Sequence, residues 1–224
     1  SLLHLVSHLG RERIPEAWEK SFSNFQARER TPKRLRRERR RQEARVHARL
    51  DVLEDLGYLQ GNEPTPRGVV ARSLNGFELQ VTELLFRGVL ECEDATALAV
   101  VFTALIHEDR RPGPPRRVPK RFYASLRSQV DKTIRRLRAR VAEADIEDLP
   151  KAPDWGLTPV VIEWMNGATF EELLELFDAG PGDVCRALRM AVQLMRQVRR
   201  AIDSDWDVHE VLGEAIQAMD RDEV

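Results

Sequence analysis

Apolar residues recur along most of this chain three and four positions apart, the spacing that places side chains on one face of an α-helix. No run of strand length alternates β-branched with polar residues. The pattern therefore predicts an all-α fold, a multi-helix bundle. The predicted helices span residues 1–9, from about 15, about 32–56, 77–87, 93–108, about 119–144, from 159, 170–177, 183–202 and 208–219.

Capping signals support two of these helix starts. Thr158 precedes Pro159, and proline is favoured at the first position of a helix, so Thr158 is predicted as an N-cap. Thr169 and Glu172 have the spacing of a capping box. The stretch 58–72 is instead rich in loop residues, and it allows a short β-turn.

The helix predicted over 183–202 separates apolar from basic side chains. At 100° per residue one stripe is apolar and contains Val184, Leu188, Ala191, Met195, Val198 and Ile202. The opposite face has no acidic residue and contains Arg186, Arg189, Gln193, Arg196, Gln197 and Arg200. Guanidinium groups pair with phosphates and stack on bases, and Gln hydrogen-bonds base or sugar edges. The face therefore suits a nucleic acid, with a solvated face or an acidic protein neighbour as the alternatives.

A second basic feature is the segment 28–45, which holds ten Lys or Arg against three Glu, a local net charge of +7. Between Arg30 and Gln42 the only apolar residue is Leu35, so a helix here is polar on all sides and is expected to project. Its candidate contacts with nucleic acid are Arg36, Arg37, Arg39 and Arg40. Such a run is a footprint of polyanion binding, but it also keeps an exposed helix solvated, and both interpretations stay open.

Charge is segregated along the whole chain. The formal net charge is only −1, from 36 Lys and Arg against 37 Asp and Glu. Residues 141–224 nevertheless hold 19 acidic and 7 basic side chains, a local net charge of −12. The basic residues concentrate in 28–45, 110–121 and 127–140. Directional binding of a polyanion explains this segregation better than solubility does, and the alternative is two halves that hold each other by charge.

The composition, 42% hydrophobic and 33% charged in 224 residues, is typical of a soluble globular chain. No apolar run approaches the roughly 18–20 residues that span a bilayer, and no signal-peptide pattern opens the chain. Cys92 and Cys185 have neither metal-site spacing nor the number expected of a disulfide framework, which favours a reducing compartment. We therefore expect a cytoplasmic protein without a membrane partner.

The sequence lacks the common signatures of catalysis. It contains no G-x-x-x-x-G-K-[ST] loop, no HExxH and no G-x-S-x-G elbow. His4 and His8 have the i,i+4 spacing of helical metal ligands, but no Cys or carboxylate completes a zinc site beside them. We expect this chain by itself to have no catalytic site, metal site or cofactor.

Several longer motifs resemble a known family. In chain order they are "RLDVLEDLGYL", "TPRGVVARSL", "FELQVTELLFRGVLE", "WGLTPVVIEWMNGATFEELLEL" and "GPGDVCRALRMAVQLMRQVRRAI". This ordered set, over about residues 49–224, is similar to the DSHCT domain, the C-terminal helical bundle of DExH-box RNA helicases of the superkiller and exosome-associated type. The stretch 2–30 is similar to the family segment that enters the arch, an insertion whose place is taken here by the basic helix.

The resemblance implies one module of an ATP-dependent 3′–5′ RNA helicase whose motor domains are absent from this chain. ATP and Mg²⁺ are then implied for those RecA-like motor domains. In the family the helical bundle closes the channel beneath the motor, and one long helix acts as a ratchet against the translocating strand. The implied partners are single-stranded RNA (or DNA), the RecA-like domains and proteins of RNA processing.

The resemblance also assigns roles to residues. The ratchet helix corresponds to 183–202, where Arg186 and Arg189 match basic positions of the family. Met190 stands where the family often has a second Arg, and Gln193 where it has an acidic residue, so base contacts at these two positions depart from the family pattern. Glu83 matches a family position near the strand path, and the alternative for Glu83 is an ordinary ion pair.

The expected organisation is a segment 1–48, which contains the basic helix, and a bundle domain 49–224. Two functions remain open. The first is the nucleic-acid-channel module of a helicase, and the second is a helical module that docks a protein partner of an RNA-processing complex. Phosphate contacts release counterions, so binding that weakens steeply with salt would favour the first.

Overall fold

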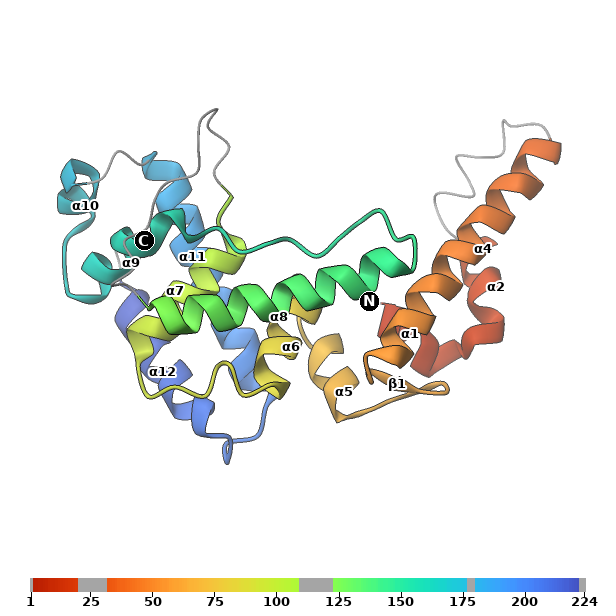
Figure 1. Ribbon diagram of the computed structural model, residues 1–224, viewed down its shortest axis with the longest axis horizontal. Coiled ribbons are helices and arrows are strands. Elements are labelled where there is room, and N and C mark those ends of the chain that lie inside the picture. The colour runs from red at the N-terminus through yellow and green to blue at the C-terminus, as the bar shows by residue number, and fades with distance from the viewer. Residues whose placement is uncertain (1, 20–31, 109–122, 177–179, 222–224) are drawn as a thin grey trace. The chain divides into compact units, whose positions relative to one another are not determined.

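The computed structural model describes residues 2–19, 32–108, 123–176 and 180–221 (Figure 1). Within these ranges the regular secondary structure is helical, apart from one antiparallel ribbon of two strands with two residues each. The predicted all-α class is therefore confirmed. Contacts divide the chain into two compact units, residues 1–72 with 138–149 and residues 73–137 with 150–224. The predicted boundary between residues 48 and 49 stays a prediction.

The first unit is a set of helices around a short hairpin. Its elements are α1 (Leu2–Leu9), a 3₁₀ turn (Arg11–Arg13), α2 (Ile14–Glu19), α4 (Pro32–Asp55), β1 (Leu59–Gln60), β2 (Glu63–Pro64) and α5 (Pro66–Arg72). β1 pairs with β2 in antiparallel register, Leu59 opposite Pro64, so the predicted β-turn is confirmed. The rest of the predicted loop is wrong, because residues 66–72 form α5.

Two positions beside this hairpin require glycine, one because of its backbone conformation and one because of close packing. Gly57 follows α4 with φ of +76°, the left-handed conformation that commonly ends a helix. Gly68 lies inside α5, where a Cβ would stand 2.1 Å from the carbonyl oxygen of Tyr58. Tyr58 itself is fully buried. The absence of a side chain at Gly68 therefore allows α5 to pack directly on the hairpin backbone.

Ion pairs attach the segment 138–149 to the second half of α4 in the same unit. Arg49 Nη2 donates to Asp148 Oδ2 at 2.9 Å, and Arg45 pairs with Glu147. Arg140 Nη2 donates to Asp55 Oδ2 at 3.2 Å. Leu50, on the inner side of α4, is completely buried. This half of α4 is thus part of the packed unit.

The second unit is a helical bundle around α7. Its elements are α6 (Glu78–Phe86), α7 (Ala95–Ile106), the first part of α8 (Ala124–Glu143), a 3₁₀ turn (Trp155–Leu157), α9 (Thr158–Met165), α10 (Phe170–Leu176), α11 (Pro181–Ala201) and α12 (Asp207–Met219). Every residue of α7 from Ala97 to Ile106 is buried, and α9, α11 and α12 pack against it. A helix that is apolar on all sides is expected at the centre of a bundle.

The caps of this unit decide where its helices begin. Asp94 caps α7 by accepting from the N–H groups of Thr96 and Ala97 at 2.9 and 3.1 Å. The predicted capping box is confirmed, since Thr169 N donates to Glu172 Oε2 at 2.8 Å and Glu172 N to Thr169 Oγ1 at 3.2 Å.

The predicted N-cap at Thr158 is wrong by one residue. Thr158 is already helical, with φ of −51° and ψ of −48°, because the 3₁₀ turn before it runs directly into α9. Its hydroxyl is buried and finds no hydrogen-bond partner among the described residues. Leu157 takes the N-cap position of α9, and the side-chain cap is at Asp154, which precedes the 3₁₀ turn and accepts from Gly156 N at 2.9 Å.

No helix in the described ranges combines the length and the apolar character that crossing a membrane would require. The predicted compartment stays a prediction.

Candidate nucleic-acid interface

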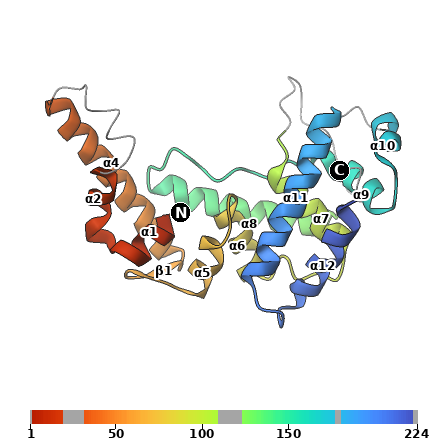
Figure 2. The same ribbon diagram turned by 180° about the vertical axis from the view of Figure 1, so that it is seen from behind.

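The interface candidate is built on α11, which lies in front of the bundle in Figure 2. The predicted apolar stripe is confirmed, since Val184, Leu188, Ala191, Met195, Val198 and Ile202 are all buried. α11 rests on α7 and α12 through this stripe. Because the stripe must face the bundle, the basic side of the helix is turned to solvent.

The exposed side of α11 holds five of the predicted residues. Arg186, Arg189, Met190, Gln193 and Arg200 are exposed, and Met190 shows 38% of its surface. Among the residues that the structure describes, no acidic side chain forms an ion pair with Arg186, Arg189 or Arg200. We call these five residues the α11 face. It presents three uncompensated guanidinium groups, one amide and one polarisable apolar side chain.

The two other predicted residues of this helix have partners inside the unit. Arg196 forms an ion pair with Asp220, which follows α12. Gln197 Oε1 accepts from Asn75 N at 2.7 Å and so holds the loop before α6. Both side chains are half-buried. These tertiary contacts reduce what Arg196 and Gln197 offer to a ligand, although helical periodicity places them with the others.

Glu83 also lies inside the second unit. It is 1% exposed, and its Oε2 accepts from Arg87 Nε at 2.8 Å, one turn further along the chain. An i,i+4 ion pair of this kind is the alternative that the sequence left open for Glu83. Because its carboxylate is turned away from solvent, we leave Glu83 out of the proposed interface.

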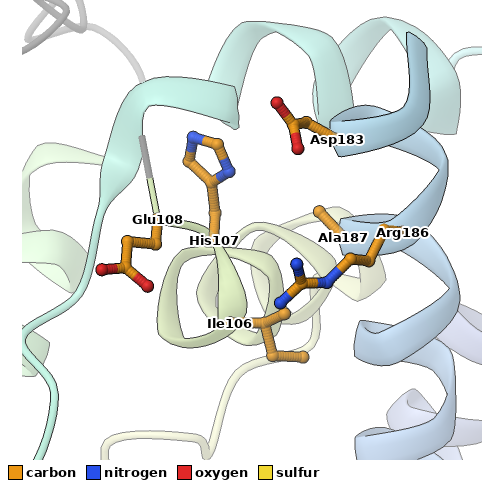
Figure 3. A pocket seen from close by; sticks show the side chains of 6 residues that line it. All are labelled: Ile106, His107, Glu108, Asp183, Arg186 and Ala187. Carbon is orange, nitrogen blue, oxygen red and sulfur yellow. The ribbon is translucent and has the colours of Figure 1, made fainter. Parts of the chain in front are cut away.

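The first turns of α11 face the end of α7 across a small hollow. Figure 3 shows Arg186 reaching from α11 towards Ile106, with His107 and Asp183 above it. The hollow has about 20 Å³ of free volume, roughly the room that one water molecule needs. A base or a nucleotide does not fit there. The hollow therefore leaves space around Arg186 and is not itself a ligand pocket.

The basic half of α4 belongs to the first unit and is treated by itself. Arg36, Arg37 and Arg40 are exposed, and the described residues provide no ion-pair partner for them. Arg39 is different, because its Nε donates to Glu43 Oε1 at 2.9 Å. Three of the four predicted arginines of α4 therefore have no ion pair with any described residue. The part of the run before residue 32 lies outside the described residues.

No group of three or more His, Cys, Asp or Glu side chains in the described ranges is placed to hold a metal ion. His4 and His8 stack on each other with ring centroids 4.2 Å apart, and His8 Nδ1 lies 3.0 Å from the His4 carbonyl oxygen. Cys92 and Cys185 are free thiols, and burial raises the pKa of Cys92.

Residues 61–224 match the DSHCT (NUC185) domain family. The chain belongs to this family. The matched segment includes α5, all of the second unit and therefore the whole of α11. The DSHCT match begins after α4, so the basic helix lies outside it.

Relatives of this DSHCT chain are named as helicases and as a superkiller component. It is 27% identical to Exosome RNA helicase MTR4 of Homo sapiens over 188 residues, 79% of this chain and 18% of that protein. It is 27% identical to Antiviral helicase SKI2 of Saccharomyces cerevisiae over 192 residues, 78% of this chain and 14% of that protein. Superkiller complex protein 2 of Mus musculus is 27% identical over 164 residues, 69% and 13% respectively. The chain thus spans less than a fifth of the length of each of these relatives.

Proposed function

We propose that this chain is the C-terminal nucleic-acid-channel module of an ATP-dependent RNA helicase and binds a single strand along the α11 face. The observation that carries the proposal is the pair Arg186 and Arg189, exposed and without ion pairs among the described residues on a helix whose other side is buried. Membership of the DSHCT family and the helicase names of the relatives support the same function.

The module binds the strand and has no part in hydrolysis. ATP and Mg²⁺ belong to RecA-like motor domains, towards which the α11 face would be turned in the intact helicase. Arg186 and Arg189 hold phosphates, and Gln193 hydrogen-bonds bases or sugars. Met190 packs against a base in place of the second Arg of the family. RNA is the proposed strand, with DNA as the alternative.

The test reverses the charge of two arginines of the α11 face in one double variant. Arg186→Glu with Arg189→Glu should leave the thermal midpoint nearly unchanged, because surface arginine changes usually cost under about 0.5 kcal/mol. In the intact helicase the double variant should weaken unwinding more than basal ATP hydrolysis. Normal unwinding by the folded variant would remove the strand-guiding role.

A matched pair of single variants sharpens this test. Log K falls as log salt rises, and Arg189→Gln should make this salt dependence shallower. The magnitude of the slope should decrease by about 0.7, the contribution of one phosphate contact to single-strand binding. Arg196→Gln should change it less, because Asp220 already neutralises this guanidinium. Salt titrations of oligouridylate binding by the two variants measure both slopes. Equal effects would mean that the contacts within the unit do not select the binding residues.

A protein-docking module is the second candidate function. The exposed Met190 at the centre of a charged face favours it, since methionine is frequent at adaptable protein interfaces. In that case strand binding by the chain would be weak and nearly independent of which arginine is changed.

A further inference from the structure

A groove runs along the first part of α8, on a surface that neither the α11 face nor α4 includes. The described residues that line it are Ala124, Arg127, Ser128, Asp131, Lys132 and Arg135, and its volume is about 480 Å³. These positions are three and four apart, so they form one helical stripe. The opposite stripe of the helix, with Val130, Ile134 and Leu137, is buried. The groove therefore belongs to the solvent side of α8.

The groove carries an excess of positive charge. Lys132 and Arg135 are exposed and have no ion pair with any side chain in the described ranges. Asp131 is the one carboxylate among the described residues of the lining, and its Oδ1 accepts from Trp155 Nε1 at 2.9 Å. The Arg127 guanidinium lies over the same indole, 5.5 Å from its centroid. Trp155 thus holds Arg127 and Asp131 in place, while Lys132 and Arg135 remain free for a ligand.

We propose that this groove binds the sugar–phosphate backbone of a nucleic-acid strand, as a second contact separate from the α11 face. Cations and a hydroxyl such as that of Ser128 are the groups that contact phosphates. The described residues of the lining include no aromatic ring on which a base would stack, so we expect contact with the backbone and no sequence preference.

The residue types of the lining also favour a nucleic-acid backbone over an acidic protein segment as the ligand. Protein interfaces depend on a few buried aromatic or large apolar anchors, and among the described residues that line the groove Ala124 is the one apolar side chain. A phosphate backbone needs no such anchor, because released counterions supply most of its affinity. The groove is therefore better suited to a polynucleotide than to a peptide.

The two surfaces lie on different sides of the second unit. α8 is in front in Figure 1, whereas the view from behind in Figure 2 has α11 in front. A strand bound to α8 consequently makes its contacts independently of those on α11. The groove does not depend on the function proposed for α11, and the two can fail separately.

The experiment measures binding of a labelled oligouridylate to the 224-residue chain over a range of salt. Lys132→Gln with Arg135→Gln should lower the salt slope by about 1.4, since each single-strand phosphate contact contributes about 0.7. The charge-retaining exchange Lys132→Arg with Arg135→Lys should keep the slope. Arg72→Gln removes one charge from an exposed arginine of the first unit that forms no ion pair in the described ranges, and it should have little effect on the slope.

An unchanged slope in the folded double variant would overturn the proposal. So would a loss of binding to a polyglutamate peptide with oligouridylate binding intact, which would assign the groove to an acidic protein. If the double variant unfolds, Ser128→Asp places a negative charge in the groove at an exposed position and should likewise weaken oligouridylate binding. When Lys132→Gln and Arg135→Gln are combined with Arg186→Glu and Arg189→Glu, the losses in log K of the two pairs should add. If only one pair weakens binding, the surface that carries the other pair does not contact the strand.

Discussion

At the scale of single residues, two helical glycines have opposite surroundings. A Cβ at Gly68 in α5 would meet the backbone oxygen of Tyr58 at 2.1 Å. A Cβ at Gly182, in the first turn of α11, would meet no atom of the described structure within 4 Å. Helix propensity by itself favours alanine at both positions, because glycine costs about 0.5–1 kcal/mol inside a helix. The atoms around each glycine therefore decide whether its replacement by alanine stabilises or destabilises the chain.

We predict that Gly68→Ala destabilises the chain by about 1–3 kcal/mol, the usual cost of overpacking a buried position. The clash is with backbone and cannot be relieved by a rotamer change. Gly182→Ala serves as the matched control and should be neutral or stabilise by up to about 1 kcal/mol. Urea unfolding of the two variants gives the comparison. A Gly68→Ala chain as stable as the wild type would contradict the close approach of α5 to the hairpin.

At the scale of elements, α4 has two halves of different character. Its first half carries Arg36, Arg37 and Arg40, which are exposed and have no ion pair with a described residue. Its second half is held by the pairs of Arg45 with Glu147 and Arg49 with Asp148. A single helix thus combines a packed portion with a basic portion exposed to solvent. The exposed portion is the candidate for non-specific affinity.

Replacing Arg36, Arg37 and Arg40 with Gln should weaken single-strand binding and reduce its salt slope by about 0.7 for each phosphate that the helix no longer binds. The control is Arg45→Gln with Arg49→Gln on the same helix. It should cost a few tenths to about 1 kcal/mol per pair in stability, as surface ion pairs do, and change the slope less. Fluorescence anisotropy at several salt concentrations measures the slope. If the triple variant binds as the wild type does, the basic run only solvates the helix.

At the scale of the whole molecule, the described residues combine basic surfaces with no metal-binding cluster, and the sequence has no phosphate-binding loop. We predict that the purified 224-residue chain has no ATP hydrolysis stimulated by nucleic acid, because its sequence offers no phosphate-binding loop to hold a nucleoside triphosphate. Phosphate release with and without oligouridylate tests this. Activity that elutes with the chain, and is free of contaminating motor protein, would contradict it.

Periodicity and capping chemistry determined much of this protein from the sequence. The helical class, the ends of α1, α4 and α12 within one or two residues, the buried stripe of α11 and the capping box at Thr169 were all predicted. Each of these features depends on interactions between residues a few positions apart, and the spacing of such residues can be read from the sequence. The exposed side of α11 follows in the same way, because its apolar stripe leaves the basic side no other direction.

The tertiary structure decided which of the polar residues are free. Arg196 and Arg189 look equivalent along the helix, yet only Arg196 meets an acid, Asp220, from another part of the chain. Glu83 is buried beside Arg87, α5 forms where a loop was predicted, and Trp155 contacts Arg127 and Asp131 of α8 from a separate segment. Most of these contacts join residues that are distant along the chain, and α5 depends on packing against such residues. The pair of Glu83 with Arg87 is the exception, because these two residues are one helical turn apart. Neither a helical period nor a local motif contains the more distant contacts, because such contacts form only when the folded chain brings separate elements together.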